Sequence, residues 1–285
     1  MSNEFEFRRH RRERERKNKM RRNFFRFVFS LVIITVFLLG VKGILTKNSK
    51  KPQDNYDIIF NDYIYPQPPE KNSDILVDAV KADGIKKAYV TFDDGPNTTV
   101  TPLVLDTLRK YNVKATFFMV GSLIEKNPAV ARRVYDEGHC LANHSYNHNY
   151  GELYADGEAF MSQIRKTKEL IDGITCDDNY PKIMRFPGGG YNAGSKGKVK
   201  QDYKLLLKDV GYRYCDWNSL TGDAEKVSPD ADYIMNSLKR STNGKEDVVI
   251  LMHDAIAKKI TAQTLPQVLE YLLEQGYEFD TLNNV

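Results

Sequence analysis

Two histidines four residues apart, His144 and His148, give the first chemical signal in the sequence. If the chain makes a helical turn there, both imidazoles lie on one face of it. Two neutral imidazoles and one carboxylate form a three-ligand site for Zn²⁺ or a similar divalent ion, with positions left for water and substrate. The pair alone is equally compatible with two hydrogen-bonded surface histidines, so a carboxylate from another segment must complete the site.

The adjacent carboxylates of Asp93 and Asp94 can supply that ligand. Neighbouring side chains diverge, so one can bind the metal while the other faces the water that the metal activates. A divalent ion lowers the pKa of such a water from about 15.7 towards about 7, and a nearby carboxylate can take its proton. The alternative is structural, because Asp-Asp-Gly-Pro at 93–96 is also a common turn sequence.

These residues need a scaffold, and the sequence from about residue 86 onward predicts one. Its short β-type runs alternate with helix-type runs, which indicates an α/β fold with a parallel sheet covered by helices, open or closed into a barrel. Aromatic residues make up 11% of the chain, which excludes low-complexity disorder. We expect strands at 88–92, 115–120, 140–143, 182–185, 213–217, 247–252 and 276–279, and helices at 101–111, 128–137, 158–171, 200–210, 229–239 and 265–275.

Polar residues end or directly follow five of these expected strands. Functional groups in parallel α/β folds gather at the carboxyl ends of the strands. One rim would therefore receive two carboxylate segments, a histidine, an arginine and a second histidine, which is an active-site pattern. The segments are Asp93-Asp94, His144, Arg185, Asp216-Trp217 and His253-Asp254.

Five segments in chain order resemble the motifs of the polysaccharide deacetylases, the NodB-homology group or carbohydrate esterase family 4. The resemblance covers about 200 of the 285 residues, from Lys86 to the C-terminus. It implies a deformed (β/α) barrel of seven to eight parallel strands, and metal-dependent removal of acetyl groups from N-acetylated sugars. The segments are Thr91-Phe92-Asp93-Asp94-Gly95-Pro96, His144-Ser145-x-x-His148, Arg185-Phe186-Pro187-Gly188-Gly189, Asp216-Trp217 and Leu251-Met252-His253-Asp254.

The resemblance implies a metal centre and a general base. Asp94, His144 and His148 would bind one divalent ion, for which we expect zinc, with cobalt, manganese or nickel as alternatives. Asp93 would be the general base, and Arg185 would pair with it to hold it ionised and oriented.

The resemblance also implies a general acid and substrate contacts. His253 would protonate the leaving amine, and Asp216 would favour the charged form of His253. The backbone N–H of Gly188 would stabilise the oxyanion together with the metal. Trp217 and Leu251 would form the walls of a small pocket for the acetyl methyl group.

The chain departs from the family pattern at 188–190, where three glycines follow Pro187. Many family members have a bulky residue directly after this proline. A backbone N–H survives the change, but the floor of the groove becomes more open and flexible. Tyr191 is our candidate for a compensating substrate-binding side chain, with Asn192 as an alternative, whereas Tyr150 and Tyr154 could stack on sugars or pack in the interior.

Other residues with chemical potential are expected to be structural. His139 follows Gly138 at the start of a strand, which is typical of a hydrogen-bonded structural histidine. The three cysteines are odd in number and lack a C-x-x-C pair, which supports neither a zinc knuckle nor a full disulfide set. Cys140 and Cys215 fit core positions, the pairing of Cys176 stays open, and Asp254 fits a turn cap.

Charge is unevenly distributed along the chain, whose formal net charge is +4. The first 26 residues hold 11 Lys and Arg against 4 Asp and Glu, a local charge of +7, which leaves −3 for residues 27–285. Residues 27–41 are uncharged, and the apolar stretch extends over 24–45 with Arg26 and Lys42 near its ends. A spanning helix needs about 20 apolar residues, so the stretch is a transmembrane candidate.

Three interpretations of this tail compete. A basic arm for nucleic acid explains the charge but not the apolar stretch, and a cleaved signal peptide lacks a good cleavage site at 40–43. An uncleaved anchor is favoured, with the N-terminus in the cytoplasm and the rest outside. The predicted organisation is a basic cytoplasmic tail at 1–23, a transmembrane anchor at 24–46, an extracytoplasmic stalk at 47–84 and a catalytic domain at 85–285.

The expected protein is thus a membrane-anchored deacetylase acting on N-acetylglucosamine in peptidoglycan. Its partner would be the glycan strand, and we expect a monomer without a nucleic-acid partner. Alternative substrates are chitin oligomers, an exopolysaccharide, N-acetylmuramic acid and xylan. A non-catalytic glycan-binding module of the envelope is the alternative from a different functional class.

Overall fold

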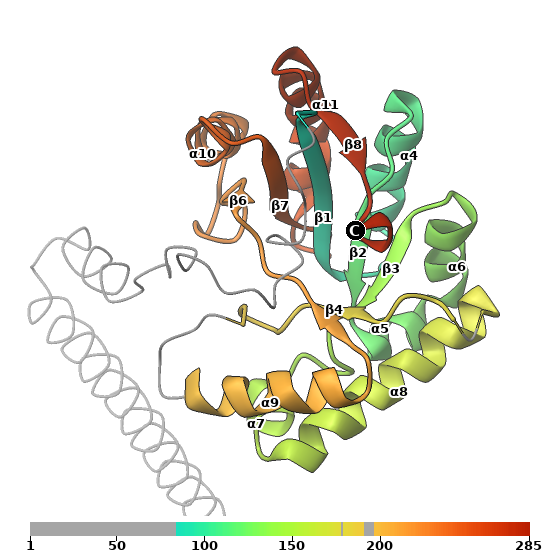
Figure 1. The fold of residues 1–285 in the computed structure, drawn as a ribbon. Coiled ribbons are helices and arrows are strands. Elements are labelled where there is room, and N and C mark those ends of the chain that lie inside the picture. The colour runs from blue at the N-terminus through green and yellow to red at the C-terminus, as the bar shows by residue number, and fades with distance from the viewer. Residues whose placement is uncertain (1–83, 178, 191–196) are drawn as a thin grey trace, which may run out of the picture. The chain divides into compact units, whose positions relative to one another are not determined.

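The computed structural model describes residues 84–177, 179–190 and 197–285 (Figure 1). The predicted tail and anchor, the stalk up to residue 83, and both Tyr191 and Asn192 lie outside the described residues. Within the described ranges, no helix has the length and apolar character needed to cross a membrane.

An eight-stranded parallel sheet forms the centre of the fold, which confirms the predicted α/β class and fits a deformed (β/α) barrel. The strand order is β5-β4-β3-β2-β1-β7-β6, and β8 pairs with β1. The strands are β1 (Lys87–Gly95), β2 (Thr116–Met119), β3 (Cys140–Asn143), β4 (Ile183–Met184), β5 (Arg213–Tyr214), β6 (Ser219–Leu220), β7 (Asp247–His253) and β8 (Glu278–Asp280).

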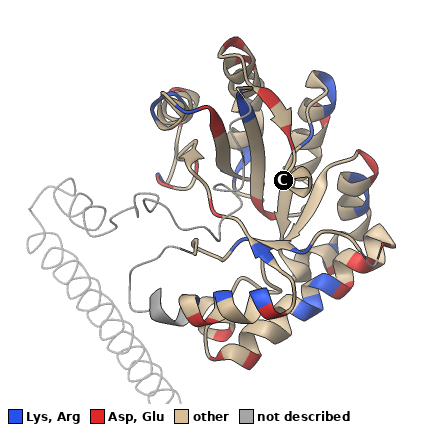
Figure 2. Ribbon diagram, viewed as in Figure 1, with Lys and Arg blue, Asp and Glu red and all other residues tan. Residues whose placement is uncertain are grey.

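Helices lie along the outside of this sheet (Figure 1). They are α4 (Thr101–Tyr111), α5 (Gly121–Lys126), α6 (Pro128–Asp136), α7 (Tyr150–Leu153), α8 (Gly157–Thr175), α9 (Gly197–Asp209), α10 (Ala231–Thr242) and α11 (Lys259–Glu274). Both signs of charge are interspersed along them, for example on α8 (Figure 2). Surface pairs such as Arg132–Asp136, at 2.8 Å, contribute at most about 0.5 kcal/mol each.

The alternation of side chains along β1 and β7 separates two cores. Val90 and Phe92 of β1 pack outward, in the cluster that includes side chains from α4 and α11. Tyr89 of β1 and Val249 of β7 pack inward, in a cluster with Phe118. Fully burying a side chain of this size contributes roughly 1.5–3 kcal/mol. Because successive residues alternate in direction, the inward face of the same two strands carries the polar groups at their carboxyl ends.

Four short elements were not predicted: α5, α7, β6 and the 3-10 helix η1 (Leu282–Asn284). Two to six residues carry too little periodicity to be recognised in a sequence. The helix expected at 265–275 begins earlier, at Lys259, and contains Pro266 in its interior. The buried residues Leu265 and Val268 on either side of this proline hold the helix against the outer core despite the missing backbone hydrogen bond.

The structural assignments of His139 and two cysteines are confirmed. His139 is 3% exposed, and its Nδ1 accepts the backbone N–H of Ala115 at 3.2 Å. Cys140 and Cys215 are buried in the inward-facing cluster, whereas Cys176 is an exposed free thiol at the end of α8.

The burial of His139 predicts a loss of stability in acid. Burial, with smaller contributions from Lys114 and Arg133, lowers the pKa of His139 to about 4 from 6.5. The stabilisation is therefore complete above pH 6.5 and is lost as the pH falls towards 4. Urea unfolding of the chelator-treated protein measures this effect. From about pH 7 to pH 4.5, the free energy of unfolding should decline by about 2 kcal/mol less in His139→Gln than in the wild type. An equal decline in both proteins would contradict this assignment.

Candidate active site

The three predicted metal ligands converge at the carboxyl ends of β1 and β3. The Nε2 atoms of His144 and His148 lie 3.5 and 3.3 Å from Asp94 Oδ1, and the possible ligand atoms all lie within 4.8 Å of one another. Asp94 Oδ1 is buried and has no hydrogen-bond partner among the described residues. An unpaired carboxylate oxygen facing two imidazole nitrogens fits a divalent cation of the kind that accepts Asp and His ligands.

His144 is held in the state that a metal ligand requires. Its Nδ1 lies 2.9 Å from the carbonyl oxygen of Arg185, so Nδ1 carries the proton and Nε2 offers its lone pair to the cluster. Burial lowers the pKa of His144 to about 3, although Asp94 opposes this shift. The imidazole is therefore neutral and ready to ligate.

The loop that carries the histidines is not a helical turn, the conformation that would have placed both imidazoles on one face. Ser145 and His148 have positive φ values of 65° and 55°, and Asp94 has a φ of 73°. The side chain of Asn143 accepts the N–H of Ser145 at 2.9 Å, which stabilises this bend. Left-handed conformations in non-glycine residues store about 1–3 kcal/mol each and persist where the surroundings impose them. Here the left-handed residues belong to the loop in which both imidazoles approach Asp94, in place of a regular helical turn.

Asp93 and Arg185 form a buried ion pair at 2.8 Å, as expected. The same guanidinium donates to Thr91 Oγ1 and to the carbonyls of Cys215 and Asp216, at 2.8–3.0 Å. Burial raises the pKa of Asp93 above its ordinary value, while Arg185 and His253 oppose the shift. A carboxylate that is fixed in position and has a raised pKa is suited to accept a proton.

The expected pairing of Asp216 with His253 is wrong, because Asp223 has that position. His253 Nδ1 lies 2.8 Å from Asp223 Oδ1. Asp216 follows β5, at the far end of the strand order, and its carboxylate accepts the N–H of Gly190 at 2.8 and 3.0 Å. Asp223 follows β6, which pairs with β7, so the sheet order brings Asp223 to His253.

The Asp223 contact sets the charge of His253. Burial lowers the pKa of His253, but the Asp223 carboxylate more than offsets this, and the pKa is raised to about 9. The contact also lowers the pKa of Asp223, against its burial. The only signal in the sequence was a polar residue shortly after a two-residue strand, which is too short to be recognised.

Asp223→Asn is therefore expected to lower the pKa of His253 while leaving a group that can still accept from Nδ1–H. The alkaline limb of the pH–rate profile should move to lower pH, and kcat at about pH 8 should fall by about 100-fold. Asp216→Asn is the matched control, because it removes another buried carboxylate, one that does not contact His253, and should leave the limb in place. An unmoved limb in Asp223→Asn would contradict the assignment.

The predicted pocket walls lie on the inward side of the sheet. Trp217 is partly buried, and its ring centre is 5.6 Å from the guanidinium carbon of Arg185. Leu251 precedes His253 by two residues on β7 and shares its face. Gly188 has a φ of 73°, and a Cβ there would lie 2.8 Å from the hydroxyl of Tyr150. Tyr150 thus occupies the space over the first of the three glycines, and its ring contacts that of His148 at 5.4 Å.

Asp254 contacts the turn that follows β1. It is fully buried and accepts the hydroxyl of Thr101 at 2.6 Å, while its backbone carbonyl accepts from Asn97 at 2.6 Å. Burial raises the pKa of Asp254 to about 7, although the Thr101 hydrogen bond opposes the shift. Gly95 lies against its carboxylate and leaves no space for a Cβ. Asp254 therefore joins the turn after β1 to α4.

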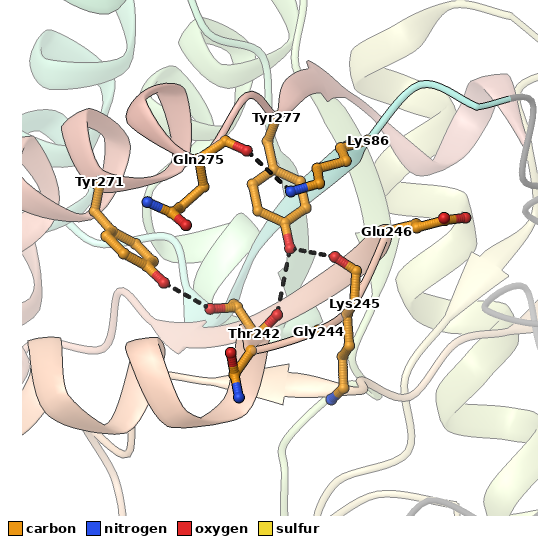
Figure 3. A pocket seen from close by; sticks show the side chains of 9 residues that line it. Lys86, Thr242, Gly244, Lys245, Glu246, Tyr271, Gln275 and Tyr277 are labelled. Atoms are coloured by element: carbon orange, nitrogen blue, oxygen red, sulfur yellow. Dashed lines mark hydrogen bonds between the residues drawn. The ribbon is translucent and has the colours of Figure 1, made fainter.

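A separate pocket of about 270 Å³ lies at the opposite end of the strands (Figure 3). Lys86 and Glu246, which line it, directly precede β1 and β7, whereas Asp93 and His253 lie at the carboxyl ends of these strands. Tyr277 closes one side by donating to the carbonyl of Lys245 at 2.7 Å. The Asp-His-His cluster and the Asp93–Arg185 and Asp223–His253 pairs are therefore distinct from this pocket.

Comparisons with known proteins indicate the family to which the chain belongs. Residues 81–214 match the family model described as polysaccharide deacetylase. The chain is 35% identical over 205 residues to the peptidoglycan-N-acetylglucosamine deacetylase PgdA of Listeria monocytogenes, covering 72% of this chain and 40% of the relative. It is 36% identical over 203 residues to a peptidoglycan-N-acetylglucosamine deacetylase of Bacillus cereus, covering 68% of each.

Among solved structures, the catalytic domain of a peptidoglycan N-acetylglucosamine deacetylase from Eubacterium rectale is similar, with a TM-score of 0.64 and 30% identity. The match covers 71% of this chain and 93% of that domain. The chain therefore belongs to the polysaccharide deacetylase family.

Proposed function

We propose that this chain is a metal-dependent hydrolase that removes the N-acetyl group from N-acetylglucosamine residues of peptidoglycan and releases acetate. The observation that carries the proposal is the placement of a buried carboxylate–arginine pair and a carboxylate–histidine pair beside an Asp-His-His cluster. The names of the relatives support the choice of peptidoglycan.

Asp94, His144 and His148 would hold the divalent ion, for which zinc is our first choice and cobalt, manganese or nickel are alternatives. When bound, such an ion polarises a carbonyl group and makes a water molecule more acidic. The unpaired Asp94 Oδ1 and the neutral His144 are the features of the chain that support this assignment.

Two inward-facing side chains and one backbone N–H would carry out the remaining steps. Asp93 would accept a proton from the water that attacks the acetyl carbonyl carbon, while Arg185 keeps its carboxylate oriented. The backbone N–H of Gly188 would donate to the carbonyl oxygen as that oxygen gains negative charge. His253 would then give a proton to the amide nitrogen, so that the C–N bond breaks and leaves acetate and a free sugar amine.

Base and acid are well placed to act on one bond. Asp93 and His253 are direct partners in the register of β1 and β7, on the same inward face. The pKa of His253, raised to about 9 by Asp223 against its burial, keeps the acid protonated at neutral pH. An ionised base beside a protonated acid is the arrangement that amide hydrolysis requires.

The proposed location is the outer face of the cytoplasmic membrane, with the N-terminus inside. Support comes from the sequence, in which a run of basic residues precedes an uncharged apolar stretch. Protease added to protoplasts should then remove residues 85–285 while the basic tail remains protected.

Acetate release by the purified full-length protein tests the function. We expect acetate from acetylated peptidoglycan, with new amino groups on glucosamine. Amines on muramic acid, or acetate from chitin oligomers or acetylated xylan alone, would replace the proposed substrate with another. Binding of these glycans without any acetate release would favour a glycan-binding module.

A further inference from the structure

The glycine loop after Arg185 is held from its buried side by three side chains. We propose that Lys200, Tyr154 and Asp216 form a clamp that fixes the 187–190 backbone and thereby aims the Gly188 N–H at the reacting carbonyl oxygen. They are positioning residues for the deacetylation, so the inference rests on the function proposed above. The clamp would replace the rigidity that three consecutive glycines lack.

Lys200 provides the central contact. It lies on α9, its side chain is 1% exposed, and its ammonium donates to the carbonyls of Gly189 at 2.5 Å and Pro187 at 3.4 Å. Burial lowers the pKa of Lys200 to about 8, although Asp216 opposes the shift. Burying an ammonium group is costly unless it binds specific acceptors. The acceptors here are backbone carbonyls of the glycine loop.

Tyr154 fixes the peptide group whose N–H would act in catalysis. Its ring is 2% exposed and its hydroxyl donates to the carbonyl of Pro187 at 2.9 Å. In a trans peptide the C=O and the following N–H point in opposite directions. Because the Pro187 carbonyl points to the buried Tyr154 and Lys200, the Gly188 N–H points away from them. Gly188 itself lies near the metal cluster, because a Cβ there would lie 2.8 Å from the hydroxyl of Tyr150, whose ring contacts that of His148.

Asp216 fixes the other end of the loop. Its carboxylate accepts the N–H of Gly190, while Lys200 binds the carbonyl of Gly189. Both polar ends of the Gly189–Gly190 peptide group are thus bound. Gly188 and Gly189 have φ values of 73° and 78°. Glycine adopts this region without a steric penalty, but it also adopts other φ values without one. The clamp restricts that freedom through the backbone alone.

Two variants with matched controls test the clamp. Tyr154→Phe removes only the hydroxyl and keeps the stacked ring. Its control is Tyr203→Phe in the same ring stack, at 6.0 Å, because the Tyr203 hydroxyl has no partner among the described residues. Lys200→Met removes the ammonium, and Lys208→Met removes an exposed charge from the same helix.

We expect kcat to fall by about 10-fold in Tyr154→Phe and about 100-fold in Lys200→Met, with KM changed by less than about 2-fold. The N–H would act mainly in the transition state, which explains the separation of kcat from KM. The amount of bound metal should stay as in the wild type, and so should the melting temperature of Tyr154→Phe. Both control variants should behave like the wild type. Equal effects in Tyr154→Phe and Tyr203→Phe, or a fall explained by lost metal, would overturn the proposal.

Hydrogen exchange of the loop amides tests the clamp in the absence of substrate. The amides of Gly189 and Gly190 should exchange at least about 10-fold faster in Tyr154→Phe and Lys200→Met than in the controls. Unchanged exchange in both variants would overturn the clamp even in an active enzyme. A wild-type protein that releases no acetate would instead refute the proposed function, and accelerated exchange would still show that these residues order the loop.

Discussion

Asp93→Asn is expected to lower kcat on acetylated peptidoglycan by about 1,000-fold while the protein keeps its metal. An amide in place of the carboxylate cannot accept a proton from water, although it can still accept a hydrogen bond from Arg185. The guanidinium retains Thr91 and the carbonyls of Cys215 and Asp216 as partners, so the fold should survive. Steady-state acetate release and metal content per chain are the two measurements.

Asp254→Asn is the matched control for this variant. It changes another buried carboxyl at the same end of β7, which contacts Thr101 and is not a member of the Asp-His-His cluster. We expect its turnover to stay within a few fold of the wild type. Near-normal turnover in Asp93→Asn, or an equal loss in Asp254→Asn, would contradict the assignment of Asp93 as the base.

His144→Ala is expected to weaken zinc binding by more than about 100-fold and to abolish turnover at stoichiometric metal. It removes one of the three proposed protein ligands, the one whose orientation is fixed by the carbonyl of Arg185. Zinc titration of the chelator-treated protein measures the affinity directly. The control is His139→Gln, which replaces another buried histidine that is not part of the Asp-His-His cluster and should bind zinc like the wild type. Equal zinc affinity in His144→Ala and the wild type would remove His144 from the metal centre.

The sequence predicted the class of fold and the composition of the rim because both depend on strong, local signals. Strands such as β1 and β7 are apolar runs that end in charged residues, and parallel strands deliver these ends to one side of the sheet. The clustering of Asp94, His144 and His148 follows from that rule. The loop between the histidines, however, contains left-handed residues that no local sequence pattern predicts.

The partner of His253 could not be predicted because it depends on the order of strands. Two aspartates lie near the end of the expected fifth strand, Asp216 within it and Asp223 six residues after it, and both are buried. Which one contacts His253 depends on β6, a two-residue strand that lies between β5 and β7 in the sequence and pairs with β7 at the edge of the sheet. Asp216 lies instead at the glycine loop, where it accepts the N–H of Gly190.

The glycine loop shows a second limit of sequence reasoning. Residues 188–190 suggested a flexible floor, whereas the structure surrounds them with Lys200, Tyr154 and Asp216. Lys200 lies on an amphipathic helix among other lysines, and nothing in its local sequence separates a buried ammonium from an exposed one. Backbone contacts of this kind become visible only when the elements are assembled.

Acetate release before and after metal removal tests the central claim most directly. Purified full-length protein should release acetate from peptidoglycan with one new glucosamine amine per acetate, lose this activity in chelator and regain it with about one equivalent of zinc per chain. Acetate release that persists when no metal remains bound would contradict a reaction centred on Asp94, His144 and His148.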